Sequence, residues 1–193
     1  MKQRRFTVSQ MFSDHMVLQQ NKKINLWGTG IDGSTVQVKT EGQNAETKVA
    51  DGRWSLQLEP MTAGGPYELQ VSCNDETRTF RDVLVGEVWL AGGQSNMELE
   101  LINSEDGVNQ VKAADHEQIR FYNVVKTGTL TEEVLAQQEK QLWKVCKPEQ
   151  AGDVSAVAYF CARRLQKELQ VPVGVIDCYI GGTSVTCWMD NDT

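Results

Sequence analysis

The stretch that decides the fold is Leu90-Ala-Gly-Gly-Gln-Ser-Asn-Met-Glu98, LAGGQSNME. It completes a nearly continuous apolar run over 83–91, which is typical of a strand covered on both faces. Two glycines then permit a sharp turn, and Ser95 opens a segment that we expect to be helical. A covered strand that turns at once into a helix indicates α/β architecture, so we place an α/β domain over residues 83–193.

The first part of the chain has a different pattern. Residues 35–39 alternate apolar and polar, and Asp51-Gly52 is a hairpin turn signal before another alternating run. Short alternating strands with frequent turns predict a small antiparallel β-sandwich domain over residues 1–82.

Two more strands, 119–125 and 171–180, and a helix over 155–170 are predicted in the second half. Strand, helix and strand in this order imply a parallel crossover. We expect Asp153 or Ser155 to cap the helix. The helix carries an apolar stripe that we expect to face the core: Val157, Phe160, Cys161, Leu165 and Leu169. Three strands are few for such a sheet, so an exposed edge is expected.

Ser95 has two interpretations. With Glu98 it matches a capping box, in which the serine caps a helix. It also follows a strand at the edge where α/β proteins bind ligands, next to a helix N-terminus. A second glycine turn, Gly181-Gly182, follows the last strand, so its N–H groups could face Ser95 and stabilise an oxyanion. Alternatively, that turn only precedes a helix capped by Thr183 or Ser184.

Composition excludes several classes of function. The net charge of −7 and the lack of a dense basic run argue against nucleic acid or an anionic membrane as a partner. No apolar stretch reaches the ~18 residues that a spanning helix needs, and no signal peptide is visible. The five cysteines form no C-x-x-C pair, so we expect no metal site and expect most of them to be buried.

Residues 86–98, GEVWLAGGQSNME, resemble the nucleophile block of the sialate O-acetylesterases, which belong to the SGNH-hydrolase superfamily. The resemblance extends over nearly the whole chain but covers only the N-terminal part of the family's length. It is carried further by residues 11–19, 51–54, 63–67, 152–160, 171–175 and 181–183, together with Trp188. The resemblance implies that the α/β domain is a partial SGNH-type domain with a parallel sheet.

The resemblance also implies an activity, namely hydrolysis of O-acetyl esters on sialic acids or related sugars without a metal or cofactor. It implies Ser95 as the catalytic nucleophile and the N–H groups of Ser95 and Gly182 as the oxyanion hole, with Gly181 shaping the turn. The substrate pocket would include Gln94, Asn96 and Trp188, although Trp188 could equally be a core residue. The resemblance also implies a periplasmic or secreted location.

One part of the family's catalytic set is missing from the sequence. The family takes its general base from a D-x-x-H block far toward the C-terminus, which we do not find. The chain has two histidines. We expect His15 to be a structural, hydrogen-bonding residue and His116 to lie in a solvated loop or helix end. The pair Asp115/His116 cannot form a catalytic arm, because adjacent side chains point apart.

We therefore expect a truncated or fragmentary esterase with weak or absent activity. The alternative is a non-catalytic carbohydrate-binding or interaction module, in which LAGGQSNME only caps a helix. The exposed sheet edge makes a homo-oligomer a further expectation.

Overall fold

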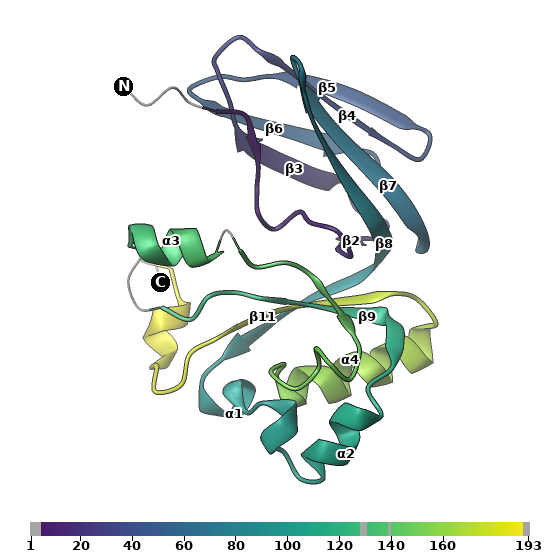
Figure 1. The fold of residues 1–193 in the computed structure, drawn as a ribbon, viewed down its shortest axis with the longest axis vertical. Coiled ribbons are helices and arrows are strands. Elements are labelled where there is room, and N and C mark those ends of the chain that lie inside the picture. The colour runs from purple at the N-terminus through teal and green to yellow at the C-terminus, as the bar shows by residue number, and fades with distance from the viewer. Residues whose placement is uncertain (1–4, 128–130, 139, 191–193) are drawn as a thin grey trace. The chain divides into compact units, whose positions relative to one another are not determined.

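The computed structural model describes residues 5–127, 131–138 and 140–190. The chain divides between Glu87 and Val88 into two compact units, and it consists mostly of sheet with a few helices (Figure 1). None of the helices in the described part of the chain is long and apolar enough to cross a membrane.

The first unit contains two sets of paired strands. β1 (Thr7–Val8), β3 (Ile24–Thr29) and β6 (Arg53–Leu58) form an antiparallel three-stranded sheet. β5 (Gln43–Lys48), β4 (Thr35–Thr40), β7 (Gly64–Cys73) and β8 (Glu76–Gly93) are antiparallel neighbours in that order, and β2 (Val17–Gln19) pairs in parallel with β8.

Alternating side chains build the core of this unit, as the sequence predicts. Along β6, Trp54, Leu56 and Leu58 are buried while the residues between them are exposed. The turn before β6 places Asp51 and Gly52 in the left-handed region, with φ values of 53° and 74°. The predicted turn is therefore confirmed, and Ala50 pairs with Arg53 across it, although β5 and β6 belong to different sheets.

β8 differs from the expected pattern. The sequence predicts one strand near 77–80 and another over 83–91, but the structure has a single strand from Glu76 to Gly93. Asp82, with φ 53°, lies inside it. The register with β7 is irregular over this part of the strand, so β8 stays paired through a residue whose conformation would normally end a strand.

The second unit is built on a sheet in the order β10-β9-β11-β8. β9 (His116–Asn123) and β11 (Val173–Tyr179) pair in parallel, which confirms the predicted crossover pair. β10 (Lys144–Cys146) is antiparallel to β9 and was not predicted, because three residues are too few to show a periodic pattern.

Helices lie on both faces of this sheet. α4 (Ala156–Leu169) follows β10 and packs on β9 and β11, and α2 (Gly107–Lys112) packs on the short helix η1 (Leu101–Asn103) (Figure 1). α3 (Glu132–Gln138) lies on the opposite face from α4. Phe121 belongs to the α4 core cluster, whereas the hydroxyl of the next residue, Tyr122, accepts a hydrogen bond from Gln138 of α3.

α4 confirms one prediction and overturns another. Ser155 is its N-cap, because its Oγ accepts a hydrogen bond from Ala158 N–H at 3.3 Å. Most of the apolar stripe does not face the core, however: Val157 is 48% exposed and Leu169 is 49% exposed, although Leu165 packs against the core. The buried side is instead made by Ala156, Ala158, Tyr159 and Ala162. Small alanine side chains let a helix approach a sheet closely, and hydrophobicity alone does not reveal that preference.

The exposed apolar side chains of α4 lie beside other exposed apolar residues, on β8. Trp89 is 49% exposed and Leu90 is 69% exposed. An apolar hollow of about 160 Å³ lies between β8 and α4, and its lining includes Leu90, Val157 and Cys161. Within the described residues, this part of the unit is an apolar surface open to solvent.

The cysteines are less buried than expected. Cys73 and Cys146 are buried and Cys178 is partly buried, but Cys161 and Cys187 are exposed. All five are free thiols. The expectation that most cysteines are buried is therefore wrong, because the face of α4 that carries Cys161 points outward.

Candidate active site

The helix that begins at Ser95 is short. α1 (Ser95–Glu98) is a single turn, its N-cap is Gln94, and no side chain makes a capping hydrogen bond. Ser95 Oγ instead donates to Gln94 Oε1 at 3.3 Å. The capping-box interpretation is therefore wrong, and a helix of this length adds little dipole at the serine.

A glycine gives α1 its position. Gly93 has φ 150°, and a Cβ at this residue would lie 2.7 Å from Met97 Cγ. Any other residue would collide with the turn that follows. Ser95 is therefore exposed, as the first residue of α1, two residues after the end of β8.

The two glycine turns lie side by side. Ile180 N–H donates to Gly93 O at 3.0 Å, which joins the end of β11 to the end of β8. A Cβ built on Gly181 would lie 3.9 Å from Ser95 Cα. Among the described residues, neither the Ser95 nor the Gly182 backbone N–H has a hydrogen-bond acceptor. Two free donors and a serine hydroxyl therefore share one edge of the sheet.

Glu98 connects these turns, a role that the sequence does not indicate. Its Oε2 accepts a hydrogen bond from Gly181 N–H, and its Oε1 accepts one from Lys126 Nζ at 2.9 Å. The Lys126 bond, and then the Gly181 bond, lower the pKa of Glu98. The spacing of Ser95 and Glu98 suggested a cap, whereas the actual partners come from segments distant in sequence.

An open hollow of about 410 Å³ adjoins the turns. It is lined by Gly92, Gly93, Gln94, Thr183, Ser184, Val185 and Trp188. Of the predicted pocket residues, Gln94 and Trp188 line it. Asn96 is exposed on α1 and does not line it.

Trp188 is held at the surface. It is 41% exposed, and its Nε1 donates to Thr183 Oγ1 at 3.0 Å, so the core alternative for this residue is wrong. Thr183 Oγ1 in turn donates to Ile180 O at 2.8 Å. The segment after Gly182 forms a short 3₁₀ helix, η2 (Val185–Trp188), whose N-cap Ser184 makes no side-chain capping bond.

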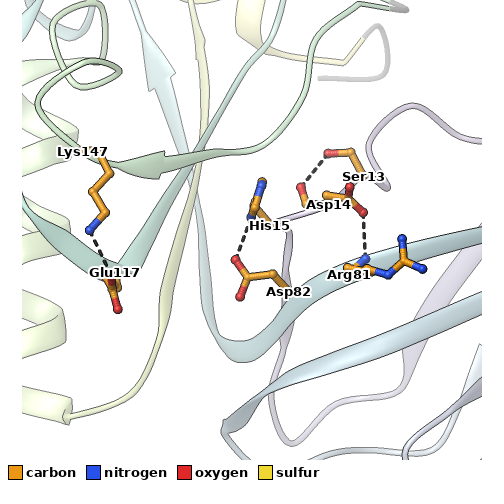
Figure 2. Close-up of polar contacts among 7 residues, drawn as sticks. All are labelled: Ser13, Asp14, His15, Arg81, Asp82, Glu117 and Lys147. Carbon is orange, nitrogen blue, oxygen red and sulfur yellow. Dashed lines mark hydrogen bonds and ion pairs between the residues drawn. The ribbon is translucent and has the colours of Figure 1, made fainter.

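His15 is structural, as predicted. Its Nδ1 lies 2.7 Å from Asp82 Oδ2, and Figure 2 shows the two groups facing each other. The preceding residue, Asp14, accepts a hydrogen bond from Arg81 N–H at 2.7 Å, also drawn in Figure 2. These contacts tie the segment around residue 15 to β8 within the first unit.

His116 is not in a solvated loop or helix end. It is the first residue of β9, is partly buried, and lies with Nε2 3.4 Å from the Tyr159 hydroxyl. Burial, followed by the charge of Arg163, lowers its pKa. Asp115 bonds Lys147 instead, so the two adjacent side chains do point to different partners. Lys147 also bonds Glu117 at 3.0 Å (Figure 2).

No group of three or more His, Cys, Asp or Glu side chains is arranged to hold a metal ion within residues 5–127, 131–138 and 140–190.

Comparisons with known proteins agree on one family. The family described as carbohydrate esterase, sialic acid-specific acetylesterase, matches residues 85–193. Sialate O-acetylesterase of Rattus norvegicus is 31% identical over 95% of this chain and 37% of its own length. The enzyme of that name from Homo sapiens is 30% identical over 95% of this chain and 38% of its own length.

A solved structure gives the same result. The crystal structure of a carbohydrate acetylesterase from Xanthomonas citri superposes with a TM-score of 0.87 at 36% identity, covering 96% of this chain and 43% of that one. The chain thus spans less than half the length of the relatives that it matches. It belongs to the sialic acid-specific acetylesterase family of carbohydrate esterases.

Proposed function

We propose that this chain carries the nucleophile and part of the oxyanion hole of a serine esterase that removes O-acetyl groups from sialic acids or related sugars. The observation that carries the proposal is the position of Ser95 beside the Gly181-Gly182 turn. Serine esterases need this combination of an exposed hydroxyl and convergent N–H donors.

The chemistry would proceed in two steps. Ser95 Oγ attacks the acetyl carbonyl, and the negative oxygen that forms accepts hydrogen bonds from the N–H groups of Ser95 and Gly182. The sugar hydroxyl then leaves with a proton, and water hydrolyses the acetyl-enzyme. Gln94 and Trp188 line the adjoining hollow, where an indole ring would contact the sugar.

A general base is needed for both proton transfers. Gln94 Oε1 accepts a hydrogen bond from the Ser95 hydroxyl, but an amide oxygen is too weak a base to take its proton. His116 faces Tyr159. We therefore propose that the isolated chain has weak or no turnover, since a serine without a base is a poor nucleophile at neutral pH.

The two sets of paired strands in the first unit support a β-sandwich, and the parallel β9–β11 pair with α4 supports a partial SGNH-type α/β domain.

The test is covalent labelling of the serine. An alkyl fluorophosphonate should form a slow adduct on Ser95, detected by peptide mass spectrometry. Ser184→Ala is the matched control because Ser184 lines the same hollow, and it should keep the adduct. Ser95→Ala should lose it. The absence of any Ser95 adduct would overturn the proposal. Binding of acetylated sugar without any reaction at Ser95 would support the non-catalytic alternative.

A further inference from the structure

Glu98 uses its two carboxylate oxygens to hold two different segments. Oε2 bonds the Gly181 amide, and Oε1 bonds Lys126 Nζ at 2.9 Å. Lys126 also lies over the Tyr179 ring, 4.9 Å from its centroid. The end of α1, the segment after β9 and the end of β11 therefore meet at one carboxylate.

Gly181 fits this contact because it has no side chain. A Cβ at this position would lie 2.5 Å from Glu98 Oε2, closer than non-bonded atoms approach. The Gly181 φ is not in the left-handed region, unlike that of Gly182 at 77°. A side chain at this position would thus displace the Glu98 carboxylate, whereas the backbone conformation of Gly181 does not itself call for glycine.

We infer that Glu98 is a positioning residue that fixes the Gly182 N–H relative to Ser95, and that Lys126 offsets its charge. Ser95 and Glu98 belong to the same turn of α1, so holding Gly181 holds the following peptide at a set distance from the nucleophile. The inference rests on the proposed function.

Lys126 has a distinct electrostatic role. A carboxylate beside an oxyanion hole would oppose the negative charge that develops there. The ammonium group of Lys126 pairs with Glu98 and reduces this repulsion. Both side chains are partly exposed, at 42% for Lys126 and 34% for Glu98, so the pair should add little to folding stability. Its removal should therefore affect reactivity more than stability.

The experiment has one readout that is independent of reactivity. In ¹⁵N-glycine-labelled protein, the Gly181 amide proton should resonate downfield, as a hydrogen bond to a carboxylate requires. Glu98→Gln, which is nearly isosteric, should move this resonance upfield because a neutral amide is a weaker acceptor. Glu105→Ala, an exposed acidic residue outside this cluster, should leave it unchanged.

The second readout is the rate of fluorophosphonate labelling at Ser95. Glu98→Ala should lower it at least tenfold with an unchanged unfolding midpoint, as expected for a displaced oxyanion donor. Lys126→Ala should also lower the labelling rate, while the Gly181 amide resonance stays downfield. Wild-type labelling rates in Glu98→Ala would overturn the inference.

The two proposals fail in different ways. If Ser95 is unreactive in every variant, the esterase proposal fails, and the Gly181 resonance still tests the contact. If Glu98→Ala does not fold, the Glu98→Gln variant tests the inference instead. An unchanged chemical shift of the Gly181 amide proton in Glu98→Gln would overturn the positioning role of Glu98.

Discussion

The backbone of Gly181 lies against that of Ser95, so closely that a Cβ on the glycine would be 3.9 Å from the serine Cα. The ends of β8 and β11 bring these residues together through the Ile180–Gly93 hydrogen bond. The candidate site therefore depends on the spacing of two backbone turns.

Gly181→Ala should separate the turns. Its Cβ would lie 2.5 Å from Glu98 Oε2, so either the carboxylate or the turn must move. We expect labelling of Ser95 by a fluorophosphonate to slow at least tenfold, while the urea unfolding midpoint changes little. Gly33→Ala is the control, because it introduces a side chain at φ 83° in the first unit without touching the site. An equal rate in Gly181→Ala and wild type would contradict the prediction.

Asp177 should make the stability of the chain depend on pH. It is 2% exposed, and burial, the largest cause, raises its pKa to about 7 from 3.8. Within the described part of the chain, its Oδ1 has no hydrogen-bond partner, and neither does Oδ1 of Asn123, at the paired position of β9. Between about pH 4 and 7 the folded state binds more protons than the unfolded state, so the free energy of unfolding should fall as pH rises.

Asp177→Asn should remove this dependence. At pH 8 the variant should be more stable than the parent by about 2–4 kcal/mol, and at pH 4 the two should be equal, as measured by urea unfolding. The Asn side chain keeps an acceptor for Ser155 N–H, which now bonds Asp177 Oδ2 at 3.2 Å. As a control, Glu105→Gln removes an exposed carboxylate and should leave the free energy of unfolding unchanged at both pH 8 and pH 4. A parent that gains stability from pH 4 to 7 relative to Asp177→Asn would refute the prediction.

The thiols should differ in reactivity according to burial. Cys161 and Cys187 are exposed and should react first with a chromogenic disulfide reagent. Cys178 should react more slowly, since burial raises its pKa. Cys73 and Cys146 should react only on unfolding, because burial raises the pKa of both thiols, that of Cys146 to about 12. Mass mapping of the labelled peptides checks this order, and early labelling of Cys146 would contradict the packing around β10.

The apolar surface of the second unit should promote self-association. Leu90 of β8 is 69% exposed and Val157 of α4 is 48% exposed, and both line the same apolar hollow. Exposed apolar surface at a sheet edge favours pairing between copies. We expect concentration-dependent sedimentation that Leu90→Lys reduces. Ile31→Lys, at a residue 51% exposed in the first unit, should not reduce it. A parent chain that is monomeric at all concentrations would disprove the idea.

Local patterns in the sequence were enough to predict many of the elements. The alternation that buries Trp54, Leu56 and Leu58 depends only on the period of a strand. The cap at Ser155 depends on residues within one turn of α4. Gly93 and Gly182 mark turns because their φ values, 150° and 77°, are ones that few other residues adopt.

Long-range contacts decided the rest. The apolar stripe of α4 predicted the wrong buried face, because the sheet accepts a helix through its alanines rather than its largest side chains. His116 was expected to be solvated, but Tyr159 partly covers it. Ser95 and Glu98 have the spacing of a capping box, yet the carboxylate binds Gly181 and Lys126.

The sequence by itself therefore determined where most of the strands and turns lie and which serine follows the first covered strand, because these features depend on neighbours along the chain. Only the tertiary structure decided that Ser95 lies beside Gly181 and that Glu98 joins them. Hydrogen bonds between distant segments form only after the sheet has placed β8 next to β11. No local sequence pattern encodes the distance between the ends of these two strands.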